Sequence, residues 1–319
     1  MSGHIYVSRR LTVAAMELLE QVSVEKQIGG ELPATRAELL AGAAGAAGVI
    51  SMLSDKIDAE FFDAAGPQLK VVANLAVGFD NIDLAEAAQR GVVITNTPGV
   101  LDNATADLTF ALLLAVTRRI VESDAWARAG KPWLWGPNEY VGLDVSNGTT
   151  LGIIGLGRIG GAVAKRAKAF DMRVIATAHR HEVGEVVDGV EIVELDTLLS
   201  EADVVSLHVP LTAANRHLID AAAIAKMKRG SYLVNAARGG VVDELAVVAA
   251  LESGQLAGAA FDVFEGEPNI RPELRARPDV VLATHIGSAG RKTRDTMGKL
   301  CIDNVLAVLS DQPALTPVE

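Results

Sequence analysis

A short glycine-rich run near the middle of the chain carries the clearest chemical signal. Gly155, Gly157 and Gly160 have the spacing G-x-G-x-x-G, directly after the apolar run Leu151–Ile154 and just before the helical pattern Ala162–Phe170. Glycines at this spacing allow a tight turn, a close approach of backbone to phosphate groups, and close packing of helix on strand. A helix N-terminus adds unpaired N–H groups and a positive dipole end. The run therefore predicts a dinucleotide site.

The next predicted strand, Arg173–Ala176, does not end in the acidic residue that would bind the adenosine ribose. Ala178 stands where that acid is expected, followed by His179, Arg180 and His181. A carboxylate there would repel a 2′-phosphate, whereas an arginine and two imidazoles favour one. The sequence therefore predicts NADP(H) as the favoured cofactor, with NAD(H) as the alternative. A solvated loop without preference is the other reading of this segment.

Three further polar segments follow predicted strands of the second half. Arg238 lies in Val234–Gly240, Glu267 lies in Asp262–Pro268, and His285 follows Thr284. The carboxyl ends of parallel strands share the sheet edge where ligands bind, so these side chains are expected near the dinucleotide. Taken singly, a histidine after a strand is usually structural, and an arginine before two glycines is often a loop charge.

Together, in this order and behind the glycine run, these segments resemble the D-isomer-specific 2-hydroxyacid dehydrogenase family. The resemblance covers nearly the whole chain and includes Asn74–Asp83, which is similar to the family's substrate-carboxylate loop. Within the family, the glyoxylate/hydroxypyruvate reductases are closest in look, through Leu53–Asp58, Gly152–Gly160 and His285–Arg294.

This resemblance implies that small 2-keto acids are reduced to D-2-hydroxy acids by a hydride from the nicotinamide. It implies that His285, paired with Glu267, delivers the proton, which suits an imidazole because a neighbouring carboxylate favours its charged form. It also implies that Arg238, whose planar fork matches a carboxylate, holds the substrate. The implied substrate-binding residues are Leu53, Ala76, Arg238, Ser288 and, through their backbone N–H groups, Val77 and Gly78.

The resemblance likewise implies a set of cofactor contacts, with Asp262 near the nicotinamide amide and Thr105 on the same ring. His208 is expected at the adenine or ribose, although a histidine packed in the protein is the alternative. The residues expected to bind the dinucleotide are Thr105, Gly155, Gly157, Arg158, Ile159, Gly160, Ala178, His179, Arg180, His208, Val209, Pro210, Ala236, Ala237, Asp262, His285 and Gly287. The sequence contains no His, Cys or carboxylate cluster with metal-ligand spacing, so no metal site is predicted.

The elements that must position these residues follow a βαβα rhythm, which indicates parallel sheets covered by helices. The fold class is therefore α/β. The resemblance further implies two Rossmann-like domains, one flavodoxin-like and one dinucleotide-binding, with a cleft between them. We expect a helix over Asp102–Arg119, with Asp102 or Asn103 as its N-cap, and a loop over Gly130–Gly148. The resemblance implies that the last helix, Arg291–Leu309, returns to the first domain. The predicted domains are 1–100 with 287–319, which binds substrate, and 101–286, which binds the dinucleotide.

Composition excludes several classes of protein. At 319 residues the chain is long enough for about two domains, and the single cysteine, Cys301, excludes a disulfide framework. A net charge of −11 argues against nucleic-acid binding. The longest apolar helical stretch, Leu108–Val116, is shorter than a membrane span, and the start does not resemble a signal peptide. A cytoplasmic protein is therefore expected. The family resemblance and the exposed-looking Asp102–Arg119 pattern suggest a homodimer, in which Trp133 or Trp135 either reaches the neighbouring active site or packs locally.

Other readings stay open at this stage. Within the family these are phosphoglycerate, D-lactate, phosphite and formate dehydrogenases. Formate dehydrogenases carry Gln where Glu267 stands, which argues against that activity. The chain has no evident regulatory domain after the last helix, which argues against a long-form phosphoglycerate dehydrogenase. A reading from another class is a non-catalytic, dinucleotide-sensing corepressor, which keeps the same fold and triad. Such proteins carry extra interaction segments, and none is evident here.

Overall fold

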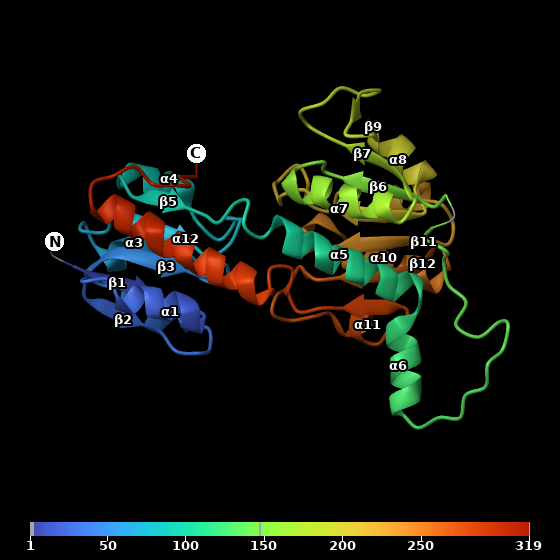
Figure 1. Cartoon of the computed structure of the whole chain (residues 1–319), viewed down its shortest axis with the longest axis horizontal. Helices are drawn as coiled ribbons and strands as arrows, with labels where there is room; N and C mark the ends of the chain where they lie inside the picture. Colours follow the sequence, from blue (N-terminus) through green and yellow to red (C-terminus); the bar gives the residue numbers. More distant parts are fainter. Residues whose placement is uncertain (1–2, 147, 319) are drawn as a thin grey trace. The chain divides into compact units, whose positions relative to one another are not determined.

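The computed structural model describes residues 3–146 and 148–318, which form two compact units (Figure 1). The first comprises Met1–Leu101 with Ala289–Glu319, and the second comprises Asp102–Ser288. The expected bounds were 1–100 with 287–319, and 101–286. The chain therefore enters the second unit at the start of a helix and returns to the first unit before its last helix.

The first unit contains a five-stranded parallel sheet with the strand order β2-β1-β3-β4-β5, the flavodoxin-like order. Successive strand residues point to opposite faces of the sheet. Helices cover both faces, and apolar side chains of the strands pack against them on each side. In β4, for example, Val72 packs with α2, α3 and α4, while Val71 and Ala73 pack with α1 and α12. The elements of this unit are β1 (His4–Val7), α1 (Val13–Glu20), β2 (Lys26–Ile28), α2 (Arg36–Ala43), β3 (Ala46–Ser51), α3 (Ala59–Ala65), β4 (Val71–Asn74), α4 (Leu84–Gln89), β5 (Val93–Thr95) and α12 (Arg291–Leu309).

The second unit contains an eight-stranded sheet with the strand order β13-β12-β11-β10-β6-β7-β9-β8. All its pairs are parallel except the hairpin of β8 and β9. Helices α5 and α7 cover one face, and α8 to α11 cover the other. Its elements are α5 (Asp102–Thr117), α6 (Ile120–Arg128), β6 (Thr150–Ile154), α7 (Arg158–Ala169), β7 (Arg173–Thr177), β8 (Val186–Val187), β9 (Val190–Ile192), α8 (Leu195–Glu201), β10 (Val204–Leu207), α9 (Ala221–Lys226), β11 (Ser231–Asn235), the 3₁₀ turn η1 (Gly239–Val241), α10 (Glu244–Glu252), β12 (Leu256–Phe261), α11 (Pro272–Arg275) and β13 (Val280–Leu282).

Helix α5 differs from its prediction in two respects. It begins at Asp102, so Asp102 and Asn103 lie inside its first turn and neither is the residue that precedes the helix. One face of the helix is also buried, since Phe110, Leu113 and Val116 pack in the core of the second unit. The reading of Asp102–Arg119 as exposed was therefore wrong, because the sheet supplies a partner for its leucines.

The chain turns sharply after α5 and forms a second helix, α6, that the sequence did not predict. Arg119 adopts a left-handed conformation with φ of 52°, which ends α5 and starts α6 at Ile120. None of the described residues of α6 is buried, so it lacks the apolar face that identifies a packed helix in a sequence.

Candidate active site

The glycine run forms a tight turn between β6 and α7. Gly155 has φ of +101°, and a Cβ there would lie 2.8 Å from the backbone oxygen of His208. A Cβ on Gly160 would lie 2.2 Å from the oxygen of Gly155, so only glycine lets α7 pack this closely. Gly157, the N-cap of α7, has open space where its Cβ would be. The first N–H groups of a helix, here those of Arg158 and Ile159, have no partner within the helix. Open space beside them fits a pyrophosphate.

The segment after β7 carries exposed His179 and Arg180 behind a partly buried Ala178. His181 contacts the Glu185 carboxylate through Nδ1 at 3.1 Å. One of the two imidazoles expected to favour a 2′-phosphate is thus engaged with an acid. Arg180 and His179 remain the cationic and polar groups at this position.

His208 follows β10 at the turn that Gly155 touches, and Val209 and Pro210 come next. Its Nε2 lies 2.8 Å from the Ser206 hydroxyl, and its Nδ1 has no hydrogen-bond partner among the described residues. Burial lowers the pKa of His208 to about 4, so this imidazole is neutral at pH 7. It is therefore a polar, uncharged group beside the glycine turn.

Arg238 is held by a clamped turn at the end of β11. The fully buried Asn235 accepts a hydrogen bond from the Ala237 N–H at 3.1 Å and donates one to the Arg238 carbonyl at 3.0 Å. These two bonds fix the backbone over Ala236 and Ala237 and so orient the arginine. The guanidinium Nη1 also donates to the Ala237 carbonyl at 2.9 Å.

Glu267 and His285 form a direct pair. The Glu267 Oε2 lies 2.7 Å from His285 Nδ1, and the Glu267 Oε1 accepts the Phe264 N–H at 2.8 Å. Burial alone would raise the pKa of Glu267, but the hydrogen bond and charge of His285, the Phe264 N–H and the charge of Arg238 together hold it below its ordinary value. The carboxylate is therefore ionised near neutral pH, and Nε2 is the imidazole nitrogen that Glu267 leaves free for another contact.

Asp262 holds the turn that carries His285. His285 has φ of 56°, an uncommon conformation for a residue with a side chain. The Asp262 carboxylate accepts the N–H groups of Ile286 and Gly287 at 2.7 and 2.8 Å, and its carbonyl accepts the N–H of His285 at 2.7 Å. Thr105 of α5 closes the same turn, since a Cβ on Gly287 would lie 3.5 Å from the Thr105 hydroxyl.

The turn that carries Arg238 packs against the loop that carries Glu267. A Cβ on Gly239 would lie 1.9 Å from the backbone carbon of Phe264, so only glycine allows this contact. Gly239 directly follows Arg238, and Phe264 supplies the N–H that binds Glu267. This packing, together with the Glu267–His285 pair, brings the three expected catalytic residues into one cluster.

The expected substrate loop lies at the carboxyl end of β4 in the first unit. The carbonyls of Ala76, Val77 and Gly78 accept hydrogen bonds from the Thr97 N–H, Asn96 Nδ2 and Asn74 Nδ2, at 2.8, 2.7 and 2.9 Å. Among the described residues, the Val77 and Gly78 N–H groups donate to no protein acceptor. A loop with occupied carbonyls and two available N–H groups can bind an anion.

Leu53 lies in a neighbouring loop after β3. The buried Asp55 accepts the Met52 N–H at 2.7 Å and the Ser8 hydroxyl at 2.5 Å, which fixes this loop. Burial raises the pKa of Asp55, although these hydrogen bonds and the charge of Arg9 lower it. Ser288 is the last residue of the second unit.

The sequence did not identify the residues that position these loops. Asn235 lies in the segment Val234–Gly240 and Asn74 begins the segment Asn74–Asp83, but Asn96 lies outside both. No spacing rule distinguishes an amide that clamps a turn from one that faces solvent. Among the described residues, no group of three or more His, Cys, Asp or Glu could hold a metal ion. The described helices include none that is long and apolar enough to span a bilayer.

Comparison with known proteins gives a consistent result. The model of the D-isomer specific 2-hydroxyacid dehydrogenase NAD-binding domain matches residues 110–287. A glyoxylate reductase of Korarchaeum cryptofilum is 45% identical over 96% of this chain and 93% of its own length. The crystal structure of a glyoxylate reductase from Paecilomyes thermophila has a TM-score of 0.88 and 33% identity, covering 99% of this chain and 98% of that one.

A second solved structure carries ligands. It is the NADPH-dependent glyoxylate/hydroxypyruvate reductase of Sinorhizobium meliloti in complex with NADP and malonate, with a TM-score of 0.86 and 33% identity. It covers 100% of this chain and 97% of that one. With a domain model that spans more than half of the sequence and relatives above 40% identity along its length, the chain belongs to the D-isomer specific 2-hydroxyacid dehydrogenases.

Proposed function

We propose that this protein reduces small 2-keto acids, glyoxylate and hydroxypyruvate above all, to 2-hydroxy acids with NADPH. The observation that carries the proposal is the cluster of Arg238, Glu267 and His285, in which His285 Nδ1 lies 2.7 Å from a Glu267 carboxylate of lowered pKa. An acid paired in this way and an arginine in the same cluster are what the reduction of a keto acid requires. The relatives named glyoxylate reductase support the choice of substrate.

Each residue of the cluster has a role in the reduction. The reduced nicotinamide, when bound, supplies the hydride to the keto carbon. The charged His285 donates its Nε2 proton to the carbonyl oxygen, and Glu267 stabilises the imidazolium through Nδ1. Arg238 binds the substrate carboxylate or polarises the ketone, and the N–H groups of Val77 and Gly78 share the carboxylate. A keto acid, one hydride and one proton then give the hydroxy acid.

The preference for NADPH rests on the segment after β7. Ala178 places no carboxylate beside a 2′-phosphate, and the exposed Arg180 supplies a positive charge. The pairing of His181 with Glu185 weakens this preference, since it brings one acid near the segment. Arg180 therefore carries the proposed selectivity. We also propose a cytoplasmic location, which fractionation of the source cells would test.

The direct test is the loss of absorbance at 340 nm when NADPH is mixed with a keto acid and the protein. Glyoxylate and hydroxypyruvate should give the highest kcat/KM in a panel that also contains pyruvate and 3-phosphohydroxypyruvate. NADH in place of NADPH should give a lower kcat/KM. Phosphite or formate with NADP⁺ tests the related activities. No turnover with any keto acid would refute the enzyme assignment, and a preference for NADH would refute the cofactor assignment alone.

A first variant tests the pairing of Glu267 with His285. The Glu267 carboxylate lies 2.7 Å from His285 Nδ1 and stabilises the imidazole that donates the proton. Glu267→Gln should lower kcat for keto-acid reduction about tenfold, because a neutral amide makes a weaker hydrogen bond to this imidazole than a carboxylate does. Glu273→Gln, on the exposed first turn of α11, is the control and should keep the wild-type kcat. A wild-type kcat in Glu267→Gln would contradict the pairing.

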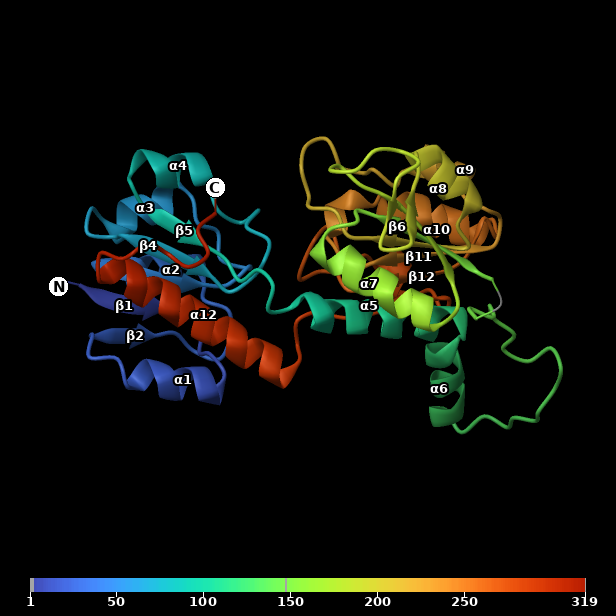
Figure 2. The same cartoon turned by 45° about the horizontal axis from the view of Figure 1, so that its top comes forward.

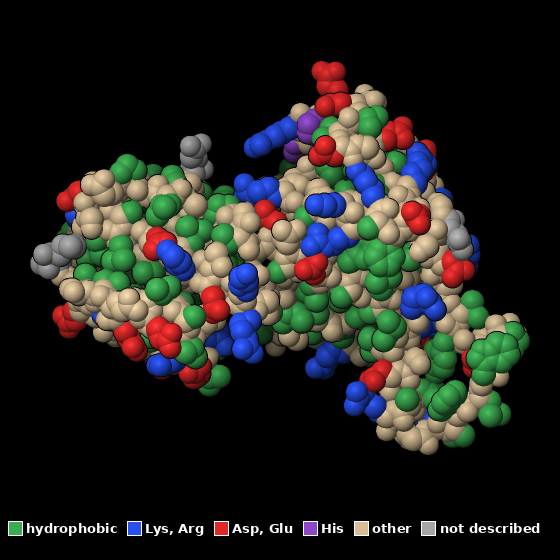
Figure 3. Space-filling model, in the orientation of Figure 1, with side chains coloured by type: hydrophobic (Ala, Val, Ile, Leu, Met, Phe, Trp, Pro, Cys, Tyr) green, Lys and Arg blue, Asp and Glu red, His purple; other side chains and the backbone are tan. Residues whose placement is uncertain are grey.

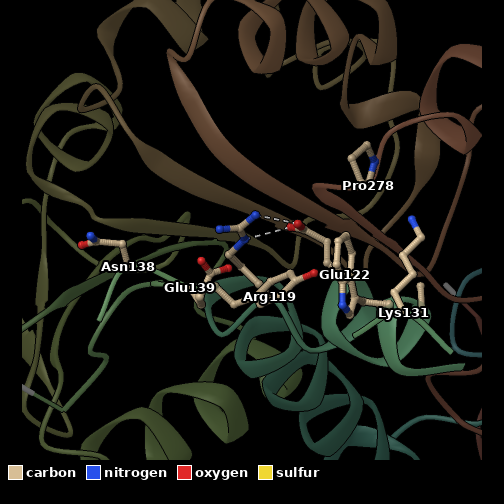
Figure 4. A pocket seen from close by; sticks show the side chains of 9 residues that line it. Arg119, Glu122, Lys131, Asn138, Glu139 and Pro278 are labelled. Atoms are coloured by element: carbon tan, nitrogen blue, oxygen red, sulfur yellow. Dashed lines mark hydrogen bonds and ion pairs between the residues drawn. The ribbon is translucent and has the colours of Figure 1, made fainter. Parts of the chain in front are cut away.

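We further propose that the protein is a homodimer, joined through an arm formed by α6 and the segment up to Val141. The arm exposes a large apolar surface for a monomer, visible as green side chains at its end in Figure 3. Trp133, Leu134 and Trp135 are 73%, 88% and 87% exposed. A pocket of about 490 Å³ lies at the base of the arm, where Arg119 pairs with Glu122 (Figure 4). This replaces α5, whose apolar face is buried, as the basis for the dimer.

Light scattering should give the molar mass of two chains for the wild type. Trp135→Asp should shift the equilibrium towards one chain, because a charge would then have to be buried in the interface. Leu32→Asp, which changes an exposed leucine of the first unit, is the control and should remain a dimer. A wild type with the mass of one chain would contradict the proposal.

A further inference from the structure

The carbonyl groups of the substrate loop determine where its N–H groups point. A trans peptide unit is planar, so its C=O and N–H point in opposite directions. The Ala76 carbonyl accepts the Thr97 N–H at 2.8 Å, and this sets the direction of the Val77 N–H. The Val77 carbonyl accepts Asn96 Nδ2 at 2.7 Å, and this sets the direction of the Gly78 N–H. Residues 96 and 97 therefore orient both donors.

The peptide unit between Asn96 and Thr97 is itself held from its other side. The Asn96 carbonyl, which opposes the Thr97 N–H, accepts the Thr316 hydroxyl at 2.7 Å. The Asn96 N–H donates to the Thr316 carbonyl at 3.3 Å. Figure 2 shows the segment after α12, in red, turning back to β5, where the Val318 N–H donates to the Ile94 carbonyl at 2.8 Å.

The direction of the Thr316 hydroxyl is fixed by Asn304 of α12, which is fully buried. Asn304 Oδ1 accepts the N–H groups of Leu315 and Thr316 at 2.9 and 3.0 Å, so the other end of the amide must be Nδ2. That Nδ2 donates to Thr316 Oγ1 at 2.9 Å. The hydroxyl oxygen is thereby an acceptor from Asn304, and its own proton goes to Asn96.

We propose that Asn304 and Thr316 are positioning residues for the substrate carboxylate, acting through a chain of hydrogen bonds. The chain runs from Asn304 Nδ2 to the Thr316 hydroxyl, through the peptide units 96–97 and 76–77, and ends at the Val77 N–H. Each donor in such a chain polarises the next, so the terminal N–H is both oriented and strengthened as a donor. The inference rests on the proposed role of Val77 and Gly78.

Thr316→Val removes the hydroxyl and keeps the shape of the side chain. We expect the KM for glyoxylate to rise about fivefold, the loss of one hydrogen bond, with little change in kcat or in the KM for NADPH. Amide hydrogen exchange across residues 75–79 of the unliganded protein should become faster. Thr316→Ser retains the hydroxyl and should restore both quantities. Leu315→Ala, in which a 58% exposed side chain is shortened, is the matched control and should behave as the wild type.

The outcomes separate this inference from the proposed function. If the wild type reduces keto acids and Thr316→Val has the wild-type KM and wild-type exchange at 75–79, the hydrogen-bond chain is wrong and the function stands. If Thr316→Val loses the binding of both NADPH and glyoxylate, the variant has lost structure generally. That outcome would also overturn the proposed chain of hydrogen bonds. If the wild type reduces no keto acid, the proposed function fails and the carboxylate role of the chain fails with it, whatever the exchange shows.

Discussion

His285→Gln is expected to lower kcat for keto-acid reduction by about 10²- to 10⁴-fold, the usual contribution of a general acid. The amide can still form a hydrogen bond near Glu267, but its N–H protons are not acidic enough to be transferred to the carbonyl oxygen. Binding of NADPH, measured by fluorescence titration, should stay close to that of the wild type.

The backbone of His285 requires a second variant. Its φ of 56° suits His, Asn and Asp better than most residues, so Gln adds strain at this turn. His285→Asn removes the acid with less strain and should be as inactive as His285→Gln. His4→Gln, which changes a histidine on β1 of the first unit, serves as the control. A kcat in His285→Asn within about tenfold of the wild type would refute the role of general acid.

Arg238→Ala is expected to lower kcat/KM for the keto acid by about 10²- to 10³-fold. The guanidinium makes charge-assisted hydrogen bonds to a carboxylate, each worth about 1.5–3 kcal/mol. Both KM and kcat should change, because the same group binds the substrate and polarises the ketone. Steady-state kinetics at saturating NADPH would measure both parameters.

Arg238→Lys shows whether the fork or only the charge is needed. Lysine keeps the positive charge but cannot bind a carboxylate with two parallel N–H groups, so it should recover only part of the activity. NADPH should bind both variants as it binds the wild type. If NADPH binding is lost while the KM for the keto acid is unchanged, Arg238 is a cofactor residue and its proposed place at the substrate is wrong.

The strands and the glycine turn were predictable because their signals are local. Short apolar runs in a βαβα order allow only a few arrangements, and parallel sheets covered on both faces follow from them. Helix α6 and the β8–β9 hairpin of the second unit were not predicted, and neither was the short strand β2 of the first unit. All three are short or largely exposed segments, for which periodicity is weak.

The proposed catalytic residues could be selected from the sequence only through their combination. Arg238, Glu267 and His285 each follow a strand, and their order matches that of the dehydrogenase family. Their contacts were not predictable. That Asn235 clamps the arginine turn, and that Asp262 binds the N–H groups of Ile286 and Gly287, depends on which neighbours each loop meets in the folded chain.

The sequence by itself determined the class of fold and the dinucleotide turn, because strand periodicity and motif spacing act within about ten residues. The proposed reacting groups came from the resemblance of the whole chain to the dehydrogenase family. Only the tertiary structure decided what orients those groups. The Thr316 hydroxyl and the Asn96 carbonyl lie 220 positions apart in the sequence, yet they meet at 2.7 Å. Such a contact arises when α12 packs on the first sheet and the following segment pairs with β5. The hydrogen-bonding needs of buried amides then select the partner, and no local pattern records that choice.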